Sequence, residues 1–281
     1  MVAMQPRTLL LIFVAWFGIS AQAPTPKEVQ RGQTKELQQL IARANGGDAA
    51  AQYSLAQRYS TGAAGVPKDF AEAALWVRKA ADQGMAKAQY ALGMMYANGQ
   101  GVMKDAAEAA KWVTKAADGG DPAAQNTLGV IYEAGQGVKQ DDAEAAKWYT
   151  KAIETYRKAA DEGDASAATA LGNIYARGQG VTGDYSEAAS WWRKAADMGY
   201  AGAQYNLGMA YERGRGVPED RVQAYLWLSL SATCTGEEQA RRAKARDTVA
   251  VGLTPEQRTE AKRLIEEWKP KAKTPAPAEA K

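Results

Sequence analysis

Residues 88–112 read AQYALGMMYANGQGVMKDAAEAAKW, and the pattern of this stretch occurs five times along the chain. Each copy ends on a tryptophan, and these tryptophans are Trp76, Trp112, Trp148, Trp191 and Trp227. They lie 36, 36, 43 and 36 residues apart. A repeat of this length is typical of a solenoid, in which each unit buries its apolar face against its neighbours. We therefore expect stacked units that share one continuous apolar seam.

Each copy predicts two helices joined by a glycine turn. Ala88, Leu92 and Tyr96 are spaced four residues apart and form the apolar stripe of a first helix. The Gly-Gln-Gly sequence at residues 99–101 ends this helix, because glycine adopts the left-handed backbone conformation without strain. The Asp-x-x-Glu sequence at residues 105–108 has the spacing of a capping box and starts the second helix. The sequence therefore predicts an all-α solenoid of two-helix repeats.

The composition argues against catalysis and against several classes of ligand. The chain of 281 residues has no histidine, so it lacks the commonest general base and the commonest metal ligand. Lysine and arginine total 35 against 32 acidic residues, and the charges are interspersed rather than gathered in the basic stripe that binds nucleic acid. The single cysteine, Cys234, cannot form an internal disulfide and fits a small packed side chain better than a redox thiol. We expect no enzyme activity, no metal or other cofactor and no nucleic acid partner.

The N-terminal residues predict export. Arg7 precedes an apolar run at residues 8–20, which is short for a membrane span and is followed by Ala21-Gln22-Ala23. This arrangement is typical of a signal peptide, here residues 1–23, and places the mature protein in the periplasm or the medium, without stable membrane insertion. Pro24 is unfavourable directly after a cleavage site, so an uncleaved membrane tether is the alternative.

The segments outside the repeats are expected to cap the array. The predicted divisions are a linker at 24–33, an N-terminal capping helix at 34–48, five repeats at 49–235, C-terminal capping helices at 236–269 and a disordered tail at 270–281. In the last capping helix, Leu264, Ile265 and Trp268 are expected to cover the final apolar face.

The third repeat contains seven additional residues, so that KWYTK at residues 147–151 is echoed by ETYRK at residues 154–158. Seven residues are close to two helical turns, so the insertion is expected to lengthen the second helix without turning its apolar face. A tolerated duplication is the simpler interpretation. The functional alternative is a projecting helix at residues 152–156 that bends the array or offers a docking ridge.

The repeats resemble the Sel-1-like repeat family, which is related to the tetratricopeptide repeats. The matching elements are Leu-Gly-x-x-Tyr, Gly-x-Gly-Val, Asp-x-x-Glu-Ala, the tryptophan and Lys-Ala-Ala, and they cover residues 34–268. The resemblance implies a right-handed superhelix whose concave face binds proteins. One branch of the family has a disulfide clamp in each repeat and binds penicillin. This chain has only Cys234, so neither property is expected to carry over.

The resemblance also implies which residues line the concave face. In tetratricopeptide-like packing these are the first-helix residues two before and two after the leucine, and those just beyond the tyrosine. The resulting candidates are Tyr53, Gln57, Thr61, Tyr90, Met94, Asn98, Asn126, Val130, Thr169, Asn173, Arg177, Tyr205, Met209 and Arg213. Tyrosine, methionine and arginine are enriched at protein interfaces. The alternative is that the tyrosines pack between adjacent repeats.

These observations favour one functional hypothesis over two others. The leading hypothesis is an exported, noncatalytic scaffold that binds a protein or peptide in its concave groove, with a role in cell-envelope assembly or regulation implied by exported members of the family. The first alternative is a β-lactam-binding or β-lactam-hydrolysing enzyme, as in the cysteine-rich branch. The second alternative is a secreted effector that acts on a host protein. The sequence leaves the oligomeric state open.

Overall fold

The computed structural model describes residues 26–63, 65–233 and 237–271, and all regular secondary structure in these ranges is α-helical. The helices are α1 (Pro26–Asn45), α2 (Ala49–Thr61), α3 (Phe70–Asp82), α4 (Ala86–Asn98), α5 (Ala106–Asp118), α6 (Pro122–Ala134), α7 (Asp142–Asp161), α8 (Ala165–Arg177), α9 (Tyr185–Asp197), α10 (Ala201–Arg213), α11 (Arg221–Ser231), α12 (Glu237–Val251) and α13 (Pro255–Glu267).

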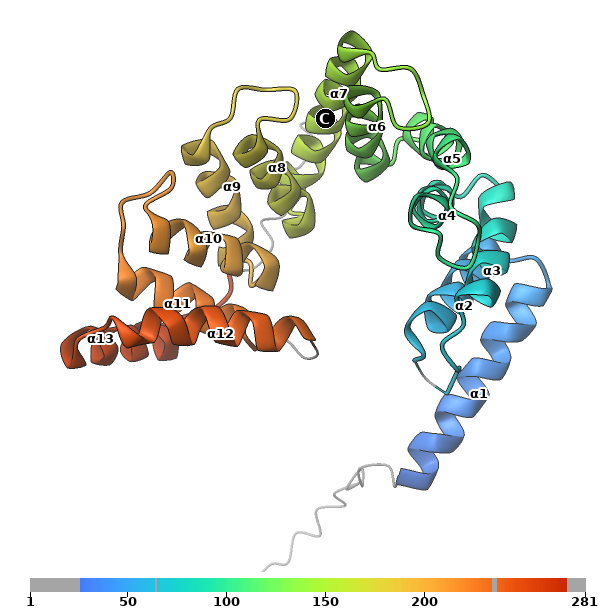
Figure 1. Cartoon of the computed structure of the whole chain (residues 1–281). Coiled ribbons are helices and arrows are strands. Elements are labelled where there is room, and N and C mark those ends of the chain that lie inside the picture. The colour runs from blue at the N-terminus through green and yellow to red at the C-terminus, as the bar shows by residue number, and fades with distance from the viewer. Residues whose placement is uncertain (1–25, 64, 234–236, 272–281) are drawn as a thin grey trace, which may run out of the picture.

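The helices pack as the repeats predict. One first helix and one second helix form each pair, from α2 with α3 to α10 with α11, and each pair also packs on the next pair along the chain. Figure 1 shows that the result is an arch, with α7 near its top and α1 and α13 at its two ends. At the C-terminal end, both α12 and α13 pack against α11. The predicted all-α solenoid is confirmed.

Each second helix starts with an aspartate that caps the backbone. The Asp105 carboxylate accepts hydrogen bonds from two N–H groups of the first turn, at 2.9 and 3.0 Å. The predicted hydrogen bond from the backbone N–H of Asp105 to the Glu108 carboxylate does not form. This N–H donates instead to the carbonyl of Tyr96 at 3.0 Å. Glu108 instead accepts from the indole Nε1 of Trp112 at 3.2 Å. The full capping box of this kind lies at residues 254–257, at the start of α13.

The glycine of the Leu-Gly pair lets the two helices of a repeat approach closely. A Cβ atom on Gly93 would lie 2.7 Å from Cγ2 of Val113, and one on Gly172 would lie 2.4 Å from Nε1 of Trp192. In both repeats the close neighbour is the residue that follows the repeat tryptophan. This position holds Val77, Val113, Tyr149, Trp192 and Leu228 in the five repeats.

Buried glutamines join one repeat to the next. Each donates a hydrogen bond of 3.1 to 3.3 Å from Nε2 to a backbone carbonyl at the end of the preceding helix, which is α1 for Gln52 and a second helix for the other three. These residues are Gln52, Gln89, Gln125 and Gln204. The fourth repeat has Ala168 at this position, so the junction between α7 and α8 lacks this hydrogen bond.

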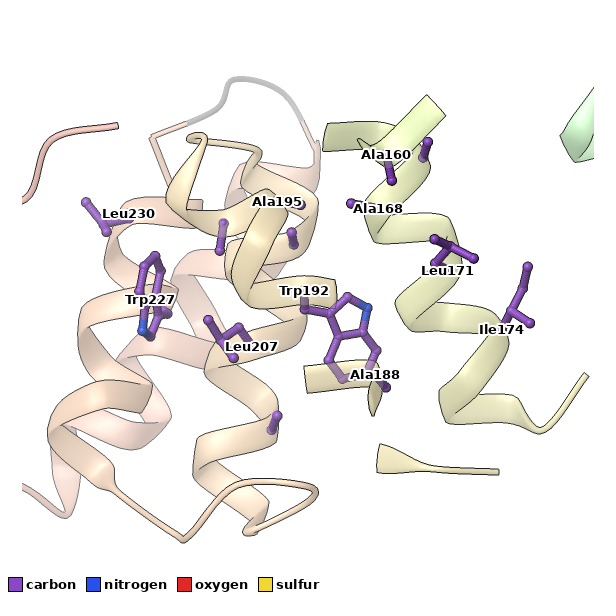
Figure 2. Close-up of a cluster of buried hydrophobic side chains, with 14 of the residues drawn as sticks. Ala160, Ala168, Leu171, Ile174, Ala188, Trp192, Ala195, Leu207, Trp227 and Leu230 are labelled. Atoms are coloured by element: carbon purple, nitrogen blue, oxygen red, sulfur yellow. The ribbon is translucent and has the colours of Figure 1, made fainter. Parts of the chain in front are cut away.

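The buried side chains form several clusters, which corrects the expected continuous seam. One cluster extends from α7 to α13 and includes Leu171, Trp192 and Trp227 (Figure 2). Another joins the second and third repeats around Leu128. α7 contributes to both of these clusters, because Trp148 packs on the one around Leu128 while Ile153 belongs to the C-terminal one.

The seven-residue insertion lengthens α7 to 20 residues, against 13 in α5, as predicted. The proposed ridge at residues 152–156 is wrong, because Ala152 is fully buried and Ile153 is only 7% exposed. Tyr156 packs on the C-terminal cluster. The inserted turns therefore pack on the C-terminal cluster, whereas Trp148 in the turns that they duplicate packs on the cluster around Leu128.

The ends of the array differ from expectation in two respects. α1 begins at Pro26, so residues 26–33 are helical rather than a linker, which suits a proline in the first turn followed by good helix formers. Lys271 is held by Asp197, with 2.7 Å from backbone N to carbonyl and 2.7 Å from Nζ to the carboxylate, so the tail starts packed on the array. Leu264, Ile265 and Trp268 pack on the C-terminal cluster, as predicted. The predicted signal peptide, Cys234 and residues 272–281 lie outside the described residues.

Candidate functional site

A pocket of about 530 Å³ opens between the first helices of the second and third repeats. We call it the α4–α6 pocket. Three sequence-predicted residues, Met94, Asn98 and Val130, line it together. The rest of its lining is Ala97, Lys104, Ala106, Ala109, Val113, Thr127, Ile131 and Gln136. In Figure 1, α4 and α6 lie toward the inside of the arch.

The α4–α6 pocket is mainly apolar with polar groups at its edge. Met94 and Val130 are partly exposed, while Val113 is only 1% exposed and forms the floor. The side chains of Lys104 and Asn98 are exposed and can donate hydrogen bonds. An apolar hollow with a few polar groups is the usual form of a binding site, and methionine adapts its shape to different ligands.

A second pocket lies at the equivalent repeat positions two repeats later, and it is lined by different side chains. We call it the α8–α10 pocket after its place in the repeats, although its lining comes from α9, α10 and the turn that follows α10, and its volume is about 200 Å³. Tyr185, Trp192, Asn206, Met209, Ala210 and Arg215 line it at the repeat positions that hold Ala106, Val113, Thr127, Val130, Ile131 and Gln136 in the α4–α6 pocket. The sequence-predicted Tyr205, Met209 and Arg213 also line it. Larger side chains therefore fill most of the space that the earlier repeats leave open.

Trp192 is the main cause of this filling. Figure 2 shows its indole ring extending from α9 toward α8, which carries Leu171. The indole Nε1 donates to Oδ1 of Asn173 at 3.1 Å, and Nδ2 of Asn206 donates to the same oxygen at 2.9 Å. The predicted residue Asn173 therefore orients the wall of the α8–α10 pocket through two hydrogen bonds.

The other predicted residues are spread along the first helices. Tyr53 and Tyr90 are half-buried and pack on the clusters between repeats, and the Tyr90 hydroxyl lies 3.1 Å from Oγ1 of Thr127. Burial raises the pKa of the Tyr53 hydroxyl. Tyr205 packs between α10 and α12 and also reaches its pocket. All three tyrosines therefore pack on buried clusters, and Tyr205 is the one of the three that also lines a pocket described above.

The remaining candidates differ widely in exposure. Gln57, Thr61 and Arg177 are exposed, whereas Thr169 is only 8% exposed and donates to the carbonyl of Ala165. Oδ1 of Asn126 is buried and has no hydrogen-bond partner among the described residues. Neither pocket described above includes these five side chains.

Sequence reasoning missed the pocket residues that come from the glycine turns and second helices. Gln136 and Arg215 are the middle residues of their Gly-x-Gly turns, and Val113 and Trp192 follow the repeat tryptophans. The position after the tryptophan varies from repeat to repeat, and this variation was the available signal there. The turn residue changes from glutamine to arginine only in the last repeat.

The described residues show no cluster of three or more metal-ligating side chains. Within the same ranges, no helix combines the length and the apolar character needed to cross a bilayer. The Tyr149 hydroxyl donates to the Glu133 carboxylate at 2.5 Å, and burial first and this carboxylate second raise the pKa of Tyr149. Such a pair stabilises the junction between α6 and α7.

Five segments of the chain match the Sel1 repeat: residues 49–85, 86–121, 122–154, 165–200 and 201–235. The chain belongs to the Sel1 repeat family. Sel1 repeat proteins are generally noncatalytic scaffolds that mediate protein interactions. Among curated protein sequences, none matches this Sel1 repeat chain.

Two solved structures of Sel1 repeat proteins are similar to this one. A Sel1 repeat protein from Oxalobacter formigenes is 30% identical with a TM-score of 0.53, and the match covers 82% of this chain and 88% of that one. The protein c5321, a protective antigen present in uropathogenic Escherichia coli strains that displays an SLR fold, is 30% identical with a TM-score of 0.45. The match covers 82% of this chain and 55% of c5321, so this chain spans about half of its length.

Proposed function

We propose that this Sel1 repeat protein is an exported, noncatalytic scaffold that binds a segment of a partner protein on the inner side of the arch. The observation that carries the proposal is the α4–α6 pocket, whose apolar wall is formed by positions that vary between repeats. Burial of one leucine-sized side chain there would stabilise a complex by about 1.5 to 3 kcal/mol. Membership of a family that generally mediates protein interactions supports the same conclusion.

A substitution that fills the pocket tests this proposal. Val113→Trp places an indole where the fourth repeat already has Trp192, and Gly93 provides the same close approach that Gly172 provides there. We expect the variant to fold, with a free energy of unfolding lowered by no more than about 1 to 3 kcal/mol. Its affinity for the partner should fall by about tenfold or more, equivalent to about 1.4 kcal/mol.

The binding measurement is a pull-down from the envelope fraction of the source cell, followed by titration of the retained protein by calorimetry. Lys111→Trp is the matched control, because Lys111 lies on the same helix but is exposed and lines neither pocket. The proposal requires a protein that wild type and Lys111→Trp retain and that Val113→Trp loses. Equal retention by all three would show that the pocket takes no part in binding.

Export is the second part of the proposal, and it rests on the apolar run at residues 8–20 followed by Ala21-Gln22-Ala23. A scaffold in this location would serve cell-envelope assembly or regulation. Fractionation of the source cell, with N-terminal sequencing of the purified protein, tests this part. We expect a periplasmic chain that starts at Pro24, and a cytoplasmic chain that still carries residues 1–23 would contradict it.

A further inference from the structure

Positive charge gathers at the C-terminal end of the inner surface. The first-helix residue that directly precedes the glycine turn is Thr61, Asn98 or Ala134 in the first three repeats and Arg177 or Arg213 in the last two. The middle turn residue likewise changes to Arg215 in the last repeat. A fourth guanidinium lies beside the α8–α10 pocket, where Cζ of Arg241 is 4.9 Å from the ring centre of Tyr205.

The carboxylates nearby leave much of this charge available. Arg213 pairs with its neighbour Glu212 at 3.2 Å, and Arg241 pairs with Glu238 at 2.8 Å. Within the part of the chain that the structure describes, neither Arg177 nor Arg215 forms an ion pair.

Arg215 is held in place by aromatic contact rather than by a carboxylate. Its Cζ lies 5.4 Å from the ring centre of Tyr185, and its Nη1 is 3.4 Å from the Tyr185 hydroxyl. Nε and Nη2 of Arg215 donate to no partner among the described residues, and these two groups can donate two parallel hydrogen bonds to a carboxylate.

The size of the α8–α10 pocket also suits a short acidic side chain. Its volume of about 200 Å³ is well below that of the α4–α6 pocket, and Trp192, Tyr185 and Tyr205 give it rigid walls. Asn206 lines the same pocket as Arg213 and Arg215, and its amide keeps one N–H for a ligand in addition to the one that it donates to Asn173. Partial exclusion of water by these walls strengthens the attraction between a guanidinium and a carboxylate.

We propose that the α8–α10 pocket binds an aspartate or glutamate side chain of a protein partner, and that this partner is the one whose apolar side chain enters the α4–α6 pocket. The inference rests on the proposed function and adds the chemistry of the partner: an acidic residue and an apolar residue presented together. A nucleic acid fits less well, because Asp142 and Glu219 occupy the repeat positions of Ala106 and Lys104 and interrupt the positive charge along the inner surface.

The test is a selection from a phage-displayed random dodecapeptide library on the purified chain. The selected sequences are synthesised and their affinities measured by fluorescence anisotropy. We expect the wild type to enrich peptides with aspartate or glutamate in addition to an apolar residue. The double variant Arg213→Gln/Arg215→Gln should bind these peptides about tenfold or more weakly, because both positive charges and their hydrogen bonds to the carboxylate are lost.

A variant with the same change of net charge provides the control. Lys87→Gln/Lys158→Gln removes two exposed positive charges outside both pockets and should bind the acidic peptides as the wild type does. Replacing the acidic residue of each peptide by its amide should weaken binding to the wild type but not further weaken binding to the arginine double variant. Equal weakening by the lysine and arginine double variants would overturn the assignment, because it would indicate general attraction by net charge.

Three further outcomes separate this inference from the proposed function. Selected peptides that bind without acidic enrichment, and whose binding Val113→Trp abolishes, would leave the proposed function intact and overturn the acidic pocket. No selected peptide on any variant would overturn both. Binding of a labelled oligothymidine that the acidic peptides displace would assign the pocket to nucleic acid and also overturn the inference.

Discussion

The α4–α6 and α8–α10 pockets are built at the same repeat positions, yet one is open and apolar while the other is small and basic. The open pocket has Val113 as its floor and Gln136 in its turn, and the small pocket has Trp192 and Arg215 in these places. The first helices around both pockets have the same length, and each ends at a glycine in the left-handed conformation. The comparison shows that the Sel1 repeat fixes the backbone and leaves the chemistry of the inner surface to a few positions.

The intermediate repeat supports this interpretation. Tyr149 takes the position of Val113 and Trp192 in the third repeat, and it is only 3% exposed. From the second to the fourth repeat this position therefore changes from valine through tyrosine to tryptophan, and each larger side chain fills more of the space beside the glycine of the Leu-Gly pair, while the fifth repeat has the smaller Leu228.

The largest effect is expected from removing the side chain that closes the second pocket. Trp192→Ala should lower the free energy of unfolding by about 3 to 5 kcal/mol, because a buried aromatic ring and its contacts are lost. Val113→Ala, at the equivalent position, removes far fewer atoms and should cost clearly less. Urea unfolding followed by circular dichroism measures both, and equal losses would show that the two positions are not comparable.

The junctions between repeats provide the next prediction. Gln204→Ala should lower the free energy of unfolding by about 1 to 3 kcal/mol, because the hydrogen bond from Nε2 to the Ala196 carbonyl and the packing of a buried side chain are lost, although that carbonyl keeps the backbone N–H of Gly199 as a donor. Gln100→Ala is the control, since this glutamine is exposed, and its effect should stay within about 0.5 kcal/mol. A Gln204→Ala variant as stable as wild type would contradict a role for the buried glutamines in joining repeats.

A smaller effect is expected at the middle repeat. Tyr149→Phe removes the hydrogen bond to Glu133 but keeps the ring beside Gly129, so the free energy of unfolding should fall by about 0.5 to 1.5 kcal/mol. The double-mutant cycle with Glu133→Gln measures the coupling between the two side chains. A coupling energy near zero would assign the whole effect to the change in packing.

The smallest effect is a dependence on alkaline pH. Burial, as the largest cause, raises the pKa of Tyr156 above its usual value of 10.0. Above that pH the unfolded chain loses this proton while the folded chain keeps it, so this residue makes stability fall as the pH rises from 10.0 toward the raised pKa. Tyr156→Phe should therefore change stability little at neutral pH and reduce the alkaline loss, by at most about 1.4 kcal/mol per pH unit. Unfolding curves at neutral and alkaline pH that show the same loss in both proteins would contradict it.

The features that could be predicted from the sequence depend on residues that lie close together along the chain. The helix pairs, the glycine turns and the aspartate caps repeat in phase, and each has a local cause that five copies make visible. The partner of Glu108 was missed because this residue satisfies two patterns. It lies three residues after Asp105, as in a capping box, and four residues before Trp112, whose indole donates to it in the structure. The start of α1 at Pro26 was missed because its first residues carry no apolar stripe.

The pockets could be predicted only in part. Met94, Asn98 and Val130 were correctly grouped on the first helices, since their positions follow from the helical period. The volume between them depends on Val113 and Ala106, which come from a different helix and appear in the sequence simply as small apolar residues. Valine, tyrosine and tryptophan at one position all satisfy the apolar pattern, so the pattern cannot distinguish an open pocket from a filled one.

The alanine at residue 168 has a mechanical consequence. The two halves of the array meet in α7, which contributes to both the cluster around Leu128 and the C-terminal one, and the following junction has no glutamine to hold it. In a solenoid each repeat contacts only its neighbours, so the free energy needed to change the curvature is lowest at the junction with the fewest stabilising contacts. We therefore expect a change in the curvature of the arch to cost least beside Ala168, where the apolar contacts of the C-terminal cluster and the hydrogen bond from Arg157 to the Tyr175 hydroxyl join α7 to α8.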